Sequence, residues 1–205
     1  MSAPQSYYVP VDAGEAEFTE KRSRFLGHVR RVETEAEARA FLDEMRKKYY
    51  DARHNCWCYV LHEGGVVRYG DDGEPQGTAG QPMLNVFQRE GVENVVCVVT
   101  RYFGGVLLGA GGLTRAYAKS AKDALDAAGK ARMRLWSAVT VDCPYPMLER
   151  LKLLAAAHGG TVEGTDFGAA VSVRILLPQE NAAGFDAALT ELSAGTMTAR
   201  REGER

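Results

Sequence analysis

Five consecutive apolar residues at positions 95–99 (VVCVV) constrain the fold of this 205-residue chain more than any other feature. A strand that faces water on one side alternates apolar and polar residues, but this run has no polar position on either face. Such a strand has to be covered on both faces. We therefore predict that residues 95–99 form a central strand of a sheet.

The segments around this strand mix helical and strand patterns. Thr34 and Glu37 form a capping box, and apolar residues then recur at helical spacing from Ala38 to Tyr49. The patterns predict strands at 24–32, 54–61 and 66–70, a hairpin turn at Gly64-Gly65, and helices at 82–89 and 113–128. Residues 1–20 are polar, and we expect them to be irregular.

A different element order begins at residue 131. Strands are expected at 132–142, 161–166, 170–177 and 196–200, with one helix after Pro146 and another capped by Asn181. The order β-α-β-β-α-β is typical of a ferredoxin-like domain. The boundary is placed near Gly129-Lys130, which gives an α+β protein with domains 1–130 and 131–205.

Charge and composition narrow the function classes. The net charge is −2, and residues 1–130 and 131–205 each carry −1, so any nucleic-acid site must be a local basic patch. The sequence contains no apolar run of membrane-spanning length and no signal-peptide pattern. Four cysteines lie inside apolar strands, which favours a reducing cytoplasm over a disulfide framework. We expect a cytoplasmic protein with no membrane partner.

One predicted strand carries three possible zinc ligands on the same face: His54, Cys56 and Cys58. Residues two apart on a strand are separated by about 6.6–6.8 Å. Tetrahedral zinc needs its sulfur ligands under about 4 Å apart. We therefore favour core packing for the cysteines, and expect no metal and no cofactor.

An acidic loop covers residues 71–82 and carries Asp71, Asp72, Glu74 and Thr78. Three carboxylates in four residues could hold a hard cation such as Mg²⁺, although the EF-hand pattern fails at Pro82. The favoured interpretation is a tight turn in which the Asp side chains bond backbone amides. A loop of about 12 residues is nevertheless often functional.

A glycine-rich loop follows the central strand. Its outward amides and the next helix N-terminus favour an anion, with Arg101, Arg115 and Lys119 adding positive charge. Close packing against another backbone explains the same glycines equally well. Arg24, in a basic run before the first predicted strand, could extend an anion site. The candidate loop residues are Gly104, Gly105, Gly109, Gly111 and Gly112.

These motifs resemble the IMPACT family, in particular its bacterial YigZ-type branch. The matching stretches are 21–25 (KRSRF), 51–56 (DARHNC), 71–82 (DDGEPQGTAGQP), 100–105 (TRYFGG) and 112–117 (GLTRAY). The resemblance implies an N-terminal domain like the second domain of a small-subunit ribosomal protein. It implies a C-terminal domain like the last domains of elongation factor G.

Family members differ in what they do. Eukaryotic members restrain the pathway of an initiation-factor kinase through an additional RWD domain, for which 205 residues leave no room, so we expect that role not to carry over. A proline-dipeptidase label borne by some members is disfavoured, because the ligands for a dinuclear metal centre are missing.

Three functional hypotheses remain open. The leading one is a translation-associated protein that binds RNA or the ribosome through the glycine-rich anion site. The rival is an enzyme or binder acting on a phosphorylated small molecule, with Asp71, Asp72 and Glu74 as metal ligands or acid/base groups. The third is a protein-interaction module that uses the C-terminal sheet. The sequence leaves open whether the chain is an enzyme.

Overall fold

The computed structural model describes residues 6–204, and side-chain burial is described for residues 6–201. The chain separates into two compact units, an N-terminal unit at Tyr7–Met133 and a C-terminal unit that starts at Arg134. The predicted boundary near Gly129-Lys130 falls at the start of β7 (Lys130–Arg134), which pairs with β1 (Ser6–Pro10). The α+β class is confirmed.

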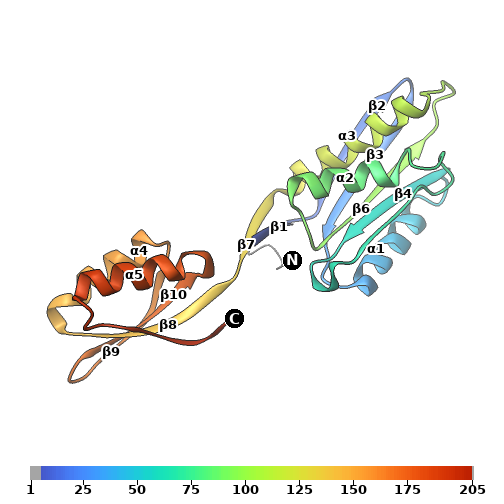
Figure 1. Ribbon diagram of the computed structural model, residues 1–205. Helices are drawn as coiled ribbons and strands as arrows, with labels where there is room; N and C mark the ends of the chain where they lie inside the picture. Colours follow the sequence, from blue (N-terminus) through green and yellow to red (C-terminus); the bar gives the residue numbers. More distant parts are fainter. Residues whose placement is uncertain (1–5, 205) are drawn as a thin grey trace. The chain divides into compact units, whose positions relative to one another are not determined.

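A five-stranded antiparallel sheet forms the centre of the N-terminal unit, in the order β2-β3-β6-β4-β5. Figure 1 shows α2 and α3 on one face of this sheet and α1 on the other. The bounds are β2 (Gly14–Glu20), β3 (Ser23–Arg31), α1 (Glu35–Lys48), β4 (His54–Val60), β5 (Val67–Gly70), α2 (Gly80–Glu90), β6 (Val95–Tyr102) and α3 (Ala110–Ala128).

The apolar run at 95–99 is the central strand β6, as predicted. Val95, Cys97 and Val99 pack with α2 and α3, whereas Val96 and Val98 pack with α1. All five side chains are buried because each face of the strand has its own helical cover. The sheet is therefore the middle layer of three.

The expectation that residues 1–20 are irregular is wrong for residues 6–20, and residues 1–5 lie outside the described part. Ala16 and Phe18 of β2 pack on the core, and the strand pairs with β3 along its length. Its glutamates face outward at the edge of the sheet, where charged residues discourage pairing with other chains. This edge composition gave β2 the polar pattern of a loop.

The C-terminal unit has the predicted element order β-α-β-β-α-β and a four-stranded antiparallel sheet, ordered β11-β8-β10-β9. Both helices pack on one face of it. Its ferredoxin-like name, like the ribosomal-domain name for the N-terminal unit, stays a prediction. The elements are β8 (Trp136–Cys143), α4 (Leu148–Ala157), β9 (Thr161–Phe167), β10 (Val171–Pro178), α5 (Ala182–Ser193) and β11 (Ala199–Glu204).

Two local predictions need correction. The strand expected at 132–142 is divided into β7 and β8, because β7 pairs with β1 and β8 pairs with β10 and β11. Asn181 does not cap α5 with its side chain; its Nδ2 instead donates to the His158 carbonyl at 2.9 Å. No helix among the described residues is long and apolar enough to cross a membrane.

Candidate functional site

The acidic loop is held together by its own carboxylates. Asp71 accepts from the amides of Gly77 (2.7 Å), Ala79 (3.1 Å) and Gly80 (2.8 Å). Asp72 accepts from the amide of Asn55 at 2.6 Å. These bonds match the turn interpretation, in which Asp side chains bond backbone amides. Within the described residues, no three His, Cys, Asp or Glu side chains are placed to hold a metal ion.

Glu74 points inward, unlike the two aspartates before it. Its Oε1 accepts from Nη1 of Arg101 at 2.6 Å and from the hydroxyl of Tyr117 at 2.8 Å. The side chains of Glu74 and Arg101 are only 3% and 6% exposed, so they form a buried ion pair. Arg101 is thus not a free surface cation, although its Nε has no hydrogen-bond partner among the described residues.

His54 lies beside this ion pair, because β4 and β6 are neighbours and their register places His54 opposite Arg101. The Nδ1 atom is 2.8 Å from the carbonyl oxygen of Asp72. A carbonyl only accepts, so this contact assigns the proton to Nδ1 and leaves Nε2 as the atom available to a ligand. Nε2 is 4.0 Å from Oε1 of Glu74.

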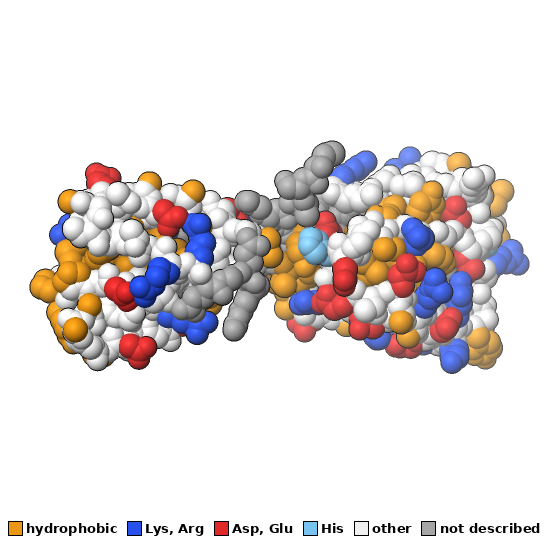
Figure 2. Space-filling model, turned by 60° about the horizontal axis from the view of Figure 1, so that its bottom comes forward, with side chains coloured by type: hydrophobic (Ala, Val, Ile, Leu, Met, Phe, Trp, Pro, Cys, Tyr) orange, Lys and Arg blue, Asp and Glu red, His pale blue; other side chains and the backbone are white. Residues whose placement is uncertain are grey.

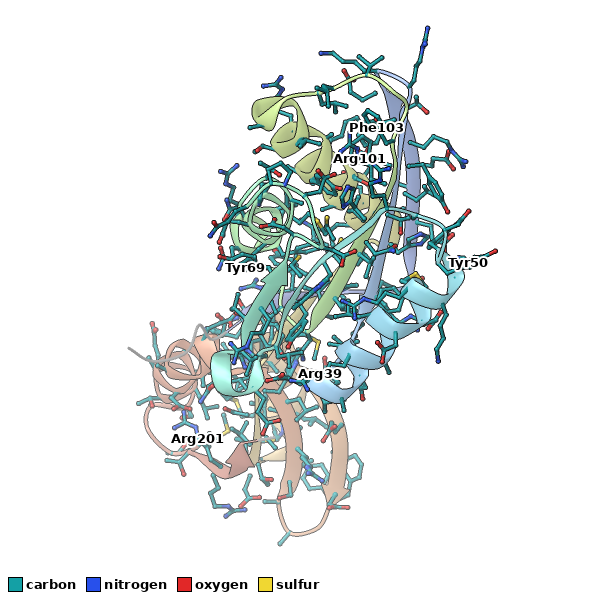
Figure 3. The ribbon with its side chains drawn as sticks, turned by 90° about the vertical axis from the view of Figure 1, so that its right-hand side faces the viewer. Arg39, Tyr50, Tyr69, Arg101, Phe103 and Arg201 are labelled. Atoms are coloured by element: carbon teal, nitrogen blue, oxygen red, sulfur yellow. The ribbon has the colours of Figure 1, made fainter. Side chains whose placement is uncertain are left out.

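A pocket of about 400 Å³ opens over these residues. Its polar lining comes from Arg53, His54, Glu74 and Arg101, and its apolar lining from Pro75, Phe103, Leu107, Leu108 and Leu113. Figure 3 labels Arg101 and Phe103 next to each other at the end of β6. Arg53 is exposed and has no ion-pair partner among the described residues. The pocket therefore combines a few cationic and polar groups with a largely apolar wall.

The N-terminus of α3 forms a further part of the pocket, through Gly109 and Ala110. No side chain caps this end, since the N-cap is Gly109. The first intrahelical bond runs from the Leu113 amide to the Gly109 carbonyl. Amides that precede it have no intrahelical partner, and they favour a negative charge.

Burial sets the protonation of the groups beneath the pocket. It raises the pKa of the Tyr117 hydroxyl strongly, with Cys56 and Glu74 adding to the effect. The phenol therefore stays protonated and donates to Glu74. Burial also raises the pKa of the Cys56 thiol, whose Sγ donates to the carbonyl of Asp71. All four cysteines are buried free thiols, which agrees with their predicted packing role.

The candidate glycines divide into three groups. A Cβ on Gly104 would lie 2.0 Å from the backbone of Arg22, so this glycine is needed for close packing. Gly105 and Gly109 have positive φ angles of 81° and 73° in open surroundings. Gly111 and Gly112 lie in the first turn of α3, which begins at Ala110 rather than at 113 as predicted.

The basic side chains that were predicted to surround one anion site lie in different places. Arg101 lines the pocket, whereas Arg115 and Lys119 line a separate hollow of about 140 Å³ with Phe18 and Glu20. Lys119 forms an ion pair with Asp123. Arg24 is paired with Glu17 at 2.8 Å, and Thr78 donates to the Pro75 carbonyl inside the acidic loop.

Sequence reasoning missed Arg53 and considered His54 only as a possible zinc ligand. The one signal that could have revealed them was the position of both residues at the start of a strand, within a matching motif. Their approach to Glu74 depends on loop 71–79 folding back over β4, as the bonds of Asp72 to β4 demonstrate. No spacing in the sequence encodes that approach.

The chain is similar to known proteins over most of its length. The model for the Impact N-terminal domain matches residues 21–125, and a domain of unknown function (DUF1949) matches residues 141–196. The chain is 36% identical to IMPACT family member YvyE of Bacillus subtilis, over 93% of this chain and 88% of that protein. It is 35% identical to IMPACT family member YigZ of Escherichia coli, over 86% and 88%.

More distant relatives match less of their own length. Protein IMPACT of Rattus norvegicus is 32% identical over 53% of this chain but 35% of that protein. A solved structure described as an hypothetical protein superposes with a TM-score of 0.61 at 33% identity, covering 96% of this chain and 97% of the other. The match to the solved structure covers both units of the chain.

Proposed function

The chain belongs to the IMPACT family, and on that premise we propose that it binds a phosphate-bearing ligand in the pocket at the start of α3. One observation carries the proposal: the uncapped N-terminus of α3, Arg53 and Arg101 line the same pocket. The free amides and the Arg53 guanidinium each favour an anion, and Arg101 adds an unpartnered Nε although its charge is paired with Glu74.

The shape and lining of the pocket favour one small anionic unit. Small-molecule pockets occupy about 300–1,000 Å³ and have mainly apolar walls with a few polar groups. This pocket has that volume and that lining. We therefore favour the phosphorylated small molecule, the rival of the sequence-based hypotheses, over a long nucleic-acid surface.

RNA or ribosome binding is the second candidate, and a separate observation favours it. Lys21 and Arg22 are exposed at the turn between β2 and β3, and Gly104 packs against this turn. An RNA chain whose end entered the pocket could continue along them. On the face drawn in Figure 2, however, Lys and Arg side chains are interspersed with Asp and Glu. A mixed surface gives RNA little overall attraction.

A translation-associated role in the cytoplasm, which the family resemblance implies, is part of this second proposal. A protein partner on the C-terminal sheet also stays a prediction. Neither proposal requires a catalytic step.

Calorimetric titration of the full chain with adenosine 5′-monophosphate tests the proposal. Arg53→Ala should weaken binding about tenfold, the loss expected for a charge-assisted hydrogen bond. The matched control is Arg39→Ala on α1, whose side chain is 72% exposed and which should bind like wild type. Equal affinity of the wild type and Arg53→Ala, or no binding by the wild type, would contradict the proposal.

The same titration with single-stranded RNA separates the two candidates. The small-molecule proposal expects tight nucleotide binding with no further gain from a longer RNA. The RNA proposal expects affinity to rise with chain length and to fall steeply with salt.

A further inference from the structure

We propose that this pocket selects a ribonucleotide with a free 2′,3′-diol, and that Glu74 and His54 receive the two hydroxyls. The inference rests on the proposed function and names its substrate class. It comes from two kinds of group in one pocket lining. Arg53 and the free amides of α3 attract an anion and are called the anion end, whereas Glu74 and His54 offer acceptors and are called the acceptor end.

The acceptor end begins with an unused oxygen of Glu74. Both hydrogen bonds to its carboxylate, from Arg101 and Tyr117, fall on Oε1. No described residue donates a hydrogen bond to Oε2, although the side chain is 3% exposed and lines the pocket. A carboxylate oxygen without a protein donor is open to a ligand group that donates a hydrogen bond.

His54 supplies a second acceptor at the same end. The carbonyl of Asp72 holds a proton on Nδ1, so in the neutral ring the lone pair of Nε2 is available to a ligand in the pocket that His54 lines. This atom lies 4.0 Å from the Glu74 carboxylate. Two neighbouring acceptors suit two neighbouring donors, and the 2′- and 3′-hydroxyls of ribose are such a pair.

The phosphate cannot take this position. A phosphate dianion offers acceptors only, and the Glu74 carboxylate would repel it. It is placed instead at Arg53 and the first turn of α3, which provide charge and free amides. A ribonucleoside 5′-phosphate carries both a phosphate and a diol, which suits a lining that holds both kinds of group.

Arg101 supports both ends of the site. It is paired with Glu74, and its unpartnered Nε belongs to a side chain in the pocket lining that is only 6% exposed. A buried donor without a partner is a second observation that calls for a ligand acceptor. Phe103, 43% exposed on the same lining, offers an aromatic face on which any base can stack.

Titration of the full chain with adenosine 5′-monophosphate and its 2′-deoxy analogue tests the inference. The ribonucleotide should bind about tenfold more tightly, since one hydrogen bond to a charged group is lost in the analogue. This comparison uses the wild-type protein and does not depend on a folded variant. Equal affinities would overturn the diol assignment while leaving the phosphate pocket intact.

His54→Ala extends the test to the residue. It should weaken binding of the ribonucleotide about tenfold, and it should change binding of inorganic phosphate little. Arg39→Ala is again the control. An equal loss for inorganic phosphate and the ribonucleotide would assign His54 to the anion end and overturn its proposed contact. If neither ligand binds the wild type, the proposed function itself fails.

Two short RNAs distinguish a free nucleotide from an RNA end. One ends in a free 2′,3′-diol and the other in a 3′-phosphate. Tighter binding of the first identifies RNA ends as a source of the ligand. Binding of neither, with the mononucleotide bound, identifies the free nucleotide. Equal binding of both RNAs through the pocket, with sensitivity to His54→Ala, would overturn the diol assignment.

Discussion

The two sheets of this protein are covered differently. In the N-terminal unit, β6 is buried on both faces, between α2 and α3 on one side and α1 on the other. In the C-terminal unit, β10 alternates buried and half-buried residues, because α4 and α5 cover one face only. Double cover lets the end of a strand carry an ion pair away from water. The candidate site therefore lies in the unit with helices on both faces.

The largest expected effect comes from breaking the buried ion pair. Glu74→Gln leaves the Arg101 guanidinium buried without its carboxylate, and should lower the stability of the N-terminal unit by about 3–5 kcal/mol. Thiol labelling during chemical denaturation measures this loss of stability separately for each unit, because each unit has its own buried cysteines. Cys56, Cys58 and Cys97 should react at lower denaturant than in wild type, while Cys143 in the C-terminal unit should be unchanged.

An exposed pair in the other unit serves as the control. Arg201 and Asp186 are 2.6 Å apart with side chains 52% and 42% exposed. Arg201→Ala should cost at most about 1 kcal/mol. Equal losses of stability for Glu74→Gln and Arg201→Ala would contradict the expectation that a buried ion pair matters more to stability than an exposed one.

Introducing an asparagine into one strand of each sheet tests whether helices on both faces of a sheet make it less tolerant of polar residues. Val98→Asn places an amide under α1 and should cost about 3 kcal/mol, through lost apolar burial and an unpaired polar group. Thr140→Asn, on the half-buried face of β8, should cost clearly less, at most about 1 kcal/mol, because no apolar core side chain is lost there. Thermal denaturation of both variants provides the measurement.

The smallest expected effect is a pH dependence confined to the N-terminal unit. Burial lowers the pKa of His28 below its ordinary value of 6.5, against the weaker opposite influence of Glu15. Both ring nitrogens are buried without hydrogen bonds, since the 3.3 Å contact of Nδ1 with Glu15 lacks bonding geometry. The unfolded chain therefore binds a proton more readily than the native chain.

The stability of the N-terminal unit should therefore fall as the pH is lowered. Stability supplied by neutral His28 is present above pH 6.5 and is lost as the pH falls through and below that value. The test measures the free energy of unfolding of the wild type and of His28→Gln from about pH 7.5 to about pH 5. This range brackets the ordinary histidine pKa of about 6.5. The variant should show a flatter profile; parallel profiles would contradict the role of His28.

Local patterns predicted most elements, and the failures have identifiable causes. Thr34 caps α1 as expected, accepting from the Glu37 amide at 3.2 Å, because that contact spans three residues. β2 was missed, since an edge strand with outward glutamates resembles a polar loop. The start of α3 was placed three residues late, because Gly111 and Gly112 have low helix propensity.

The sequence by itself determined the central strand at 95–99, the family through its motifs, and the presence of two units with different element orders. Only the tertiary structure decided that Glu74 meets Arg101 and Tyr117, which lie 27 and 43 residues away along the chain. It also decided that Arg101 and Arg115 line different hollows. The reason is physical: periodicity records which face of an element is buried, whereas these contacts depend on strand register and on how a loop folds over it.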